Sequence, residues 1–109
     1  MMAELLRVAP RGHADVFRRS DDGAGWTAAG ELTFANAGPA LAAAQVLPLP
    51  ASGVIDCAGI TGADSAAIAV LLALKRRAAV SGSALSFARA PALVAILAEL
   101  YDVEGILEA

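Results

Sequence analysis

The sequence has little of what disulfide-bonded, metal-binding or catalytic domains depend on. Its 109 residues include one cysteine, Cys57, and one histidine, His13. A single cysteine forms no internal disulfide, and its place in an apolar stretch favours a buried, reduced thiol over a reactive nucleophile. His13 has no second residue at metal-ligand spacing. We therefore expect a surface histidine, no metal and no cofactor.

Charge is also scarce. Charged residues make up 17% of the chain, and 8 basic against 11 acidic side chains give a net charge of −3. The basic residues do not gather around aromatic ones, as they do in domains that bind nucleic acid. Nucleic acid is therefore a poor candidate partner.

Long uninterrupted apolar runs are missing, although 58% of the residues are apolar. Residues 33–55 carry no charge, but prolines, Asn36 and Gln45 interrupt them, which excludes one lipid-exposed helix. Glu4 and Arg7 interrupt the N-terminus in the same way, so no signal peptide is expected. We expect a soluble cytoplasmic protein without direct membrane insertion.

Catalytic motifs are absent as well. Residues 59–65 place two glycines before a helix but lack the Lys-Ser/Thr pair of a phosphate-binding loop. No base is placed beside a nucleophile, and Asp56 is interpreted as a structural hydrogen-bond acceptor. We predict a protein that is not an enzyme.

The most informative stretch runs from residue 54 to residue 80. The run around Ile55 and Cys57 predicts a short strand covered on both faces, and Gly59 and Gly62 predict the turn that ends it. Asp64 then predicts a helix start, with its carboxylate accepting from an amide of the first turn.

Ser65 is expected to be the first helical residue. The helix has one apolar stripe for the core, and a second stripe that is also partly apolar: Ser65, Ile68, Ala69, Leu72 and Arg76. A helix on the outside of a small domain normally has polar residues there, so the second stripe predicts a partner surface. The alternatives are that another part of the same chain covers it, or that two scattered apolar residues have no meaning.

The remaining pattern predicts strands and helices in alternation. We expect a hairpin with strands over 14–19 and 26–33, a short helix over 39–46 capped by Asn36, and a strand over 85–88. A last helix opens at Pro91, and residues 101–107 are expected to fold back onto the domain. The side chains of this helix that are expected to face the sheet are those of Leu93, Ile96, Leu97 and Leu100. The pattern as a whole predicts a single α/β domain over residues 1–109, with a mixed β-sheet and helices packed against it. Residues 1–12 are expected to fray or to form an edge segment.

Three stretches resemble the STAS domain, the family named after sulfate transporters and anti-sigma factor antagonists. They are V-I-D-C-A-G-I-T-G-A-D-S-A-A-I-A-V-L-L-A-L from residue 54, G-E-L-T before it and P-A-L-V-A-I-L-A-E-L-Y-D-V after it. The resemblance covers residues 14–107. It implies a STAS-like fold and a binding module whose partner docks around the start of the long helix.

One branch of the family looks closer than the others. The single hydroxyl residue after the aspartate, Ser65, resembles the cytoplasmic STAS subunit of Mla-type ABC transporters, which move phospholipid to maintain bacterial outer-membrane asymmetry. The resemblance implies binding to the transporter's ATPase subunit, and a location peripheral to the inner membrane through that partner. It assigns the ATPase contact to Asp64, Ser65, Ile68, Ala69, Leu72 and Arg76.

Other functions stay open at this point. An anti-sigma factor antagonist would carry phosphate from a partner serine kinase on Ser65, although Ala66 and Ala67 depart from that branch's loop. A homodimeric or ligand-sensing STAS module would use the same stripe on itself. Ser65 could also be only a favourable helix-end residue, and Asp64 only a cap.

Overall fold

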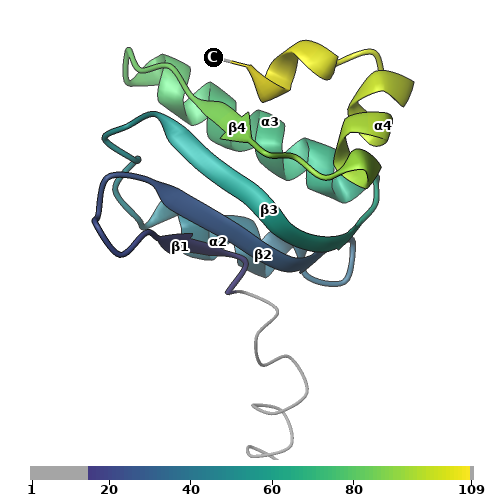
Figure 1. Ribbon diagram of the computed structural model, residues 1–109, viewed down its shortest axis with the longest axis horizontal. Helices are drawn as coiled ribbons and strands as arrows, with labels where there is room; N and C mark the ends of the chain where they lie inside the picture. Colours follow the sequence, from purple (N-terminus) through teal and green to yellow (C-terminus); the bar gives the residue numbers. More distant parts are fainter. Residues whose placement is uncertain (1–14, 109) are drawn as a thin grey trace, which may run out of the picture.

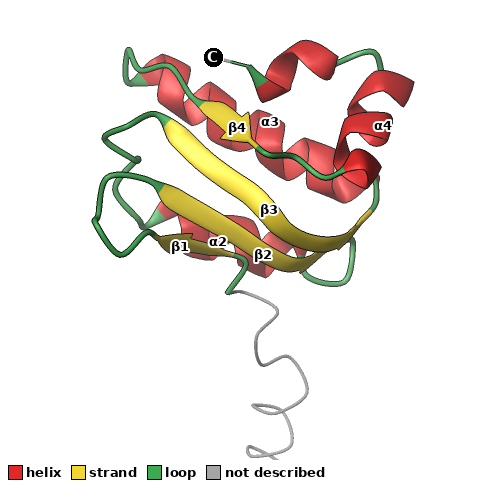
Figure 2. Cartoon of the chain, viewed as in Figure 1, coloured by secondary structure: helices red, strands yellow, loops and turns green. Residues whose placement is uncertain are grey.

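A four-stranded mixed sheet with helices packed against it forms the domain (Figures 1 and 2). The computed structural model describes residues 15–108, so the expectations for residues 1–12 and for His13 lie outside the described residues. The strands are β1 (Phe17–Arg19), β2 (Trp26–Leu32), β3 (Val54–Ala63) and β4 (Ser86–Ala88). The helices are α2 (Ala37–Gln45), α3 (Ser65–Val80), α4 (Ala92–Leu100) and the short 3-10 helix η1 (Glu104–Leu107). The predicted fold class and the order of its elements are confirmed.

The strands lie in the order β1-β2-β3-β4. β1 and β2 form an antiparallel hairpin, whose turn is held by Asp22: its carboxylate accepts from the Ser20 hydroxyl at 2.6 Å and from the Ala24 amide at 2.9 Å. β3 runs parallel to both β2 and β4, and parallel neighbours require crossover connections. α2 and α3 are those crossovers, so both helices begin at the edge of the sheet where β2 and β3 end.

β3 is longer than the sequence pattern indicates, and the predicted glycine turn is wrong. The strand continues through Gly59 and Gly62 to Ala63. Its register against β2 shifts twice, between Thr27 and Ala29 and between Gly30 and Glu31, and each shift inserts one extra residue into β3. Here the glycines lie at β-bulges and at a close approach of two backbones. Glycines in a sequence are compatible with either a bulge or a turn, so the pattern alone does not distinguish the two.

The expectation that β3 is covered on both faces is also wrong. Ile55, Cys57 and Ile60 are buried, whereas Ala58 and Thr61 are exposed. The exposed side chains Ala58 and Thr61 are small, so the stretch resembles a fully buried strand although it is solvated on one side.

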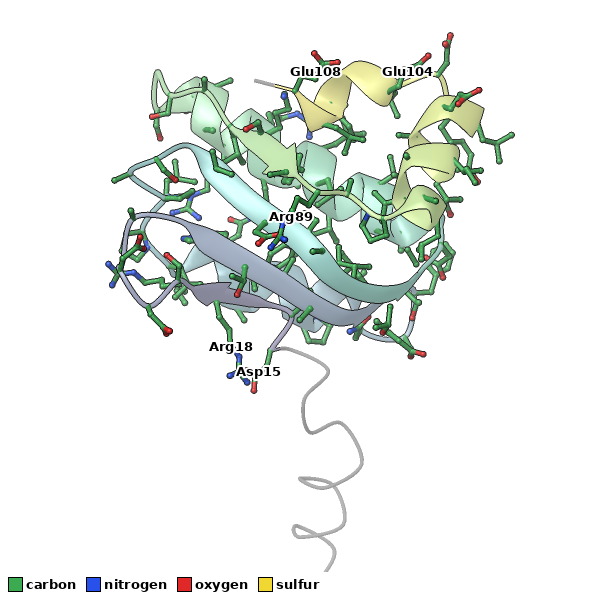
Figure 3. All side chains as sticks on the ribbon, in the orientation of Figure 1. Asp15, Arg18, Arg89, Glu104 and Glu108 are labelled. Carbon is green, nitrogen blue, oxygen red and sulfur yellow. The ribbon has the colours of Figure 1, made fainter. Side chains whose placement is uncertain are left out.

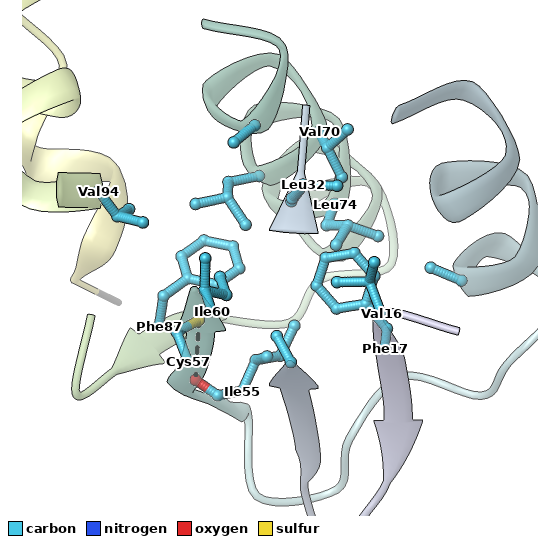
Figure 4. Close-up of a cluster of buried hydrophobic side chains, with 14 of the residues drawn as sticks. Val16, Phe17, Leu32, Ile55, Cys57, Ile60, Val70, Leu74, Phe87 and Val94 are labelled. Carbon is cyan, nitrogen blue, oxygen red and sulfur yellow. Dashed lines mark hydrogen bonds between the residues drawn. The ribbon is translucent and has the colours of Figure 1, made fainter. Parts of the chain in front are cut away.

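The core lies between the sheet and the helices, where side chains of all four strands meet those of α3 and α4 (Figure 4). Trp26 is 2% exposed, and its indole nitrogen donates to the carbonyl of Pro48 at 3.0 Å. Phe17 lies against it, with ring centroids 6.1 Å apart. A buried indole needs such an acceptor, and this one fixes the segment between α2 and β3 onto the hairpin.

Asn36 precedes α2 but its side chain does not cap the helix, contrary to the sequence expectation. Its amide oxygen accepts from the Thr33 backbone at 2.9 Å, and its amide nitrogen donates to the Glu31 carbonyl at 2.7 Å. The side chain is thus turned back towards β2 and fixes the end of that strand. At the other end of α2, the Arg77 guanidinium of α3 donates to the carbonyls of Ala44 and Leu47, at 3.2 and 2.6 Å.

The face of α4 that is buried differs from the predicted one. Val94 and Ala98 are buried, Leu93 and Leu97 are half-buried, and Ile96 and Leu100 are 62% and 71% exposed. The predicted folding back of the tail is confirmed by Ile106, which is buried in the core cluster. Lys75 of α3 holds this tail by donating to the Leu85 and Ile106 carbonyls, both at 2.9 Å, and to the Glu108 carbonyl.

Candidate functional site

The predicted start of the long helix is confirmed. Asp64 has extended backbone dihedrals, and its carboxylate accepts from the Ala66 amide at 2.8 Å. The carbonyl of Asp64 accepts from the Ala67 amide at 3.0 Å, so two of the first amides of the helix are satisfied by one residue. Ser65 follows as the first helical residue and is half-buried at the helix mouth.

Asp64 also contacts a second segment that the sequence pattern does not indicate. The other oxygen of its carboxylate accepts from the backbone amide of Phe34 at 3.0 Å. Phe34 lies in the loop between β2 and α2, which meets the loop after β3 because the two parallel strands end at the same edge. The two residues are 30 positions apart, so no local pattern indicates their contact. Only the expectation of parallel strands that end at the same edge could have suggested it.

The interpretation of Ile68 as an exposed contact is wrong. Its side chain is 4% exposed and belongs to the core cluster. Seven residues are close to two helical turns, so Ile68 lies on the same side of α3 as Lys75, which binds the tail. α3 packs against α4 and η1 on that side. The alternative that the chain covers part of its own stripe therefore holds for Ile68.

The rest of the stripe is at least partly open to solvent, although Leu72 also packs against the core cluster. Ala69 and Arg76 are exposed, and Ser65 and Leu72 are half-buried. These four residues, which we call the outer α3 face, follow one line along the helix for about 16 Å at 1.5 Å per residue. The face has a hydroxyl at one end, small and aliphatic side chains in the middle and a cation at the other end.

A family model described as "Mlab, STAS domain" matches residues 16–108. The chain belongs to this family. The STAS domain predicted from its sequence is therefore confirmed, and with it the MlaB-type branch. Among curated proteins, no match is found.

Within this MlaB-type STAS domain, residues 15–108 hold no group of three His, Cys, Asp or Glu side chains that could bind a metal ion. Cys57 is fully buried, and burial raises the pKa of its thiol to about 12. The thiol is therefore protonated at neutral pH and unsuited to nucleophilic attack. No helix among the same residues has the length and apolar character needed to cross a bilayer.

Asp56 of the STAS domain lies on the solvated face of the sheet and has a structural partner. Its carboxylate accepts from the Arg89 guanidinium, once at 3.1 Å and once in a closer contact, and from the Ala58 amide at 3.1 Å. The hydrogen bond from Arg89 lowers the pKa of this carboxyl. Figure 3 shows Arg89 lying across β3. This geometry supports a structural acceptor, as interpreted from the sequence.

Proposed function

We propose that this chain is the regulatory or assembly subunit of an Mla-type ABC transporter for phospholipid, and that it binds the ATPase subunit. It acts without catalysis of its own, on the cytoplasmic side of the inner membrane, where its partner holds it. Membership of the MlaB-type STAS family supports this role.

The outer α3 face carries the proposal. Helix α3 is flanked by α2 on one side and by α4 and η1 on the other, yet Ala69 and Arg76 stay exposed. Leu72 stays partly open to solvent as well. Full burial of an exposed leucine side chain contributes about 1.5 to 3 kcal/mol, so a partner that completes the burial of the half-buried Leu72 gains part of that value. Asp64, which caps α3, fixes the position of Ser65 at the end of this face.

Co-purification of the ATPase with tagged variants of this chain tests the proposal. Ser65→Glu adds a charge at the helix mouth, and Ala69→Arg adds a long cation in the middle of the face. We expect both to lose the ATPase while remaining folded. Val46→Arg places the same cation at a residue that is 82% exposed, just after the C-terminus of α2, and should retain it. Retention of the ATPase by both face variants, or no co-purification by the unchanged protein, would refute the proposal.

The second candidate is an anti-sigma factor antagonist controlled by phosphorylation of Ser65. One observation favours it, since the Ser65 side chain lies half-exposed at the start of a helix, where the dipole tolerates added negative charge. Incubation with a cognate serine kinase and intact-mass measurement distinguishes the two functions. If the mass of the chain does not increase by that of a phosphate group, the antagonist function is excluded.

A further inference from the structure

Phe34 is an exposed aromatic residue beside the outer α3 face. Its side chain is 77% exposed, although a benzyl group of this size gains free energy from burial. Its backbone amide lies 3.0 Å from the carboxylate of Asp64, the residue immediately before Ser65. The side chain is therefore attached to the same edge of the molecule as the proposed ATPase contact.

Several hydrogen bonds fix the loop that carries Phe34. The Thr33 amide donates to Asn36 at 2.9 Å, and the Thr33 carbonyl accepts from the Asn36 and Ala37 amides at 3.0 and 2.8 Å. The Ala35 amide donates to the Thr33 hydroxyl at 3.2 Å. Asn36, at the base of the loop, is 4% exposed. A loop fixed in this way loses little conformational entropy when a partner binds.

Two other strongly exposed apolar residues, Val80 and Val46, lack this arrangement. Val80 is 85% exposed at the C-terminal end of α3, which is the opposite end of the helix from Ser65. Val46 follows α2, which runs parallel to α3, so it lies at that same far end. Phe34 alone among these three is continuous with Asp64 and Ser65.

We propose that Phe34 is the apolar anchor of the ATPase interface, and that Asp64 is the residue that positions it. This inference rests on the proposed function and extends its surface across the loop between β2 and α2. The partner it requires is a protein with an apolar pocket large enough for a phenyl ring, next to the groups that meet Ser65. Aromatic side chains buried in such pockets often dominate the affinity of an interface.

The first experiment measures the dissociation constant of the purified ATPase subunit for three variants by isothermal titration calorimetry. Phe34→Ala should raise the constant at least about tenfold, and Phe34→Leu, which keeps apolar volume, should restore most of the affinity. Val80→Ala is the control, because it truncates an equally exposed apolar side chain at the far end. It should stay within about twofold of the unchanged protein.

The second experiment separates the two hydrogen bonds of Asp64. Asp64→Ser keeps an N-cap hydroxyl for α3 but lacks the second oxygen, Oδ2, with which Asp64 accepts from the Phe34 amide. We expect nearly unchanged urea unfolding, faster hydrogen exchange at the Phe34 amide and a severalfold weaker ATPase complex. Faster exchange with unchanged affinity would overturn the positioning role.

The outcomes distinguish this inference from the proposed function. If Ser65→Glu abolishes ATPase binding while Phe34→Ala leaves it unchanged, the function stands and the anchor is refuted. If the unchanged protein does not bind the ATPase, both are refuted. If Phe34 mediates self-association, seen by light scattering as a dimer that Phe34→Ala dissociates without any change in ATPase binding, the anchor is assigned to the wrong partner.

Discussion

Gly59 lies at a close approach of β3 to β2. A Cβ atom at this residue would stand 2.8 Å from the Ala29 Cβ and 3.0 Å from the Ala28 carbonyl oxygen, and neither atom belongs to a flexible side chain. At Gly62 the nearest atom would be Glu31 Cγ, at 3.2 Å, on a side chain that can move away. We expect Gly59→Ala to lower the free energy of unfolding by about 1 to 3 kcal/mol, and Gly62→Ala to lower it much less.

Urea unfolding followed by the fluorescence of Trp26, the single tryptophan, measures both values. A loss at Gly59 no larger than the loss at Gly62 would contradict the prediction, because it would show that β3 can move away from β2 at Gly59 as easily as the Glu31 side chain moves at Gly62.

The ion pair between Asp56 and Arg89 gives the domain an acid-sensitive contribution to stability. The hydrogen bond from Arg89 lowers the pKa of Asp56 below its ordinary value of 3.8. A carboxyl whose pKa is lower in the folded state stabilises the fold above the unfolded pKa, and this stabilisation disappears as the pH falls through the folded pKa. Asp56→Asn should therefore be less stable than the unchanged protein at about pH 7, and the difference should shrink below about pH 4.

Urea unfolding at a series of pH values tests this, with Arg89→Met as the second variant. Arg89→Met leaves the Asp56 carboxylate but removes its hydrogen-bond donor. Its free energy of unfolding should therefore also be lower than that of the unchanged protein at about pH 7, and this difference should also shrink in acid. A difference from the unchanged protein that stays constant down to acid pH would show that the pair adds nothing to stability.

Single residues were predictable where their partners are close in sequence. The cap at Asp64 depends on an amide two positions away, and local chemistry is enough to assign it. The contact of the same carboxylate with Phe34 spans 30 positions and depends on two loops meeting at one edge of the sheet. No local pattern encodes that meeting, which is why the sequence predicted Asp64 and Ser65 but missed Phe34.

At the scale of elements, the C-terminal tail depends on one side chain of α3. Lys75 donates to three carbonyls, one at Leu85 before β4 and two in the tail, at Ile106 and Glu108. Lys75→Met keeps the aliphatic stem and removes all three donors, so we expect η1 to loosen before the rest of the fold. Hydrogen exchange at the Ile106 amide should accelerate at least about tenfold, because hydrogen bonds to a charged group contribute roughly 1.5 to 3 kcal/mol.

Arg76→Met is the matched control for Lys75. Arg76 is the next residue and is exposed, so its replacement should leave exchange at Ile106 unchanged. If both variants exchange alike, the tail is held by the packing of Ile106 and not by the ammonium group.

The existence of each helix and strand was predictable, but the side that a helix buries was less so. In α4 nearly every residue is apolar, so the period alone does not select a face, and the small pair formed by Val94 and Ala98 is what packs closely. Tertiary packing also explains Ile68, which is buried on a helix that packs against both α4 and η1. A helix pattern gives the number of apolar faces, whereas tertiary packing decides which of them meet another helix.

At the scale of the whole molecule, the topology separates two ends. β2 and β3 are parallel and finish at one edge, where Phe34, Asp64 and Ser65 gather. α2 and α3 run back from that edge, so Val46 and Val80 lie at the opposite end, and Val80 is about 22 Å from Ser65 along α3. The alternation of strands and helices was enough to predict the fold class, but not that these loops form one surface.

This separation predicts a directional footprint when the ATPase binds. Amides of residues 33–37 and 64–69 should exchange more slowly in the complex, because the partner covers the loop before α2 and the first turn of α3. Amides of residues 20–25 in the hairpin turn and of residues 80–83 after α3 should be unchanged. Hydrogen exchange with mass spectrometry on the free chain and on the complex measures all four segments together. Protection at residues 80–83 without protection at 33–37 would place the partner at the other end of the domain, which Phe34 cannot reach.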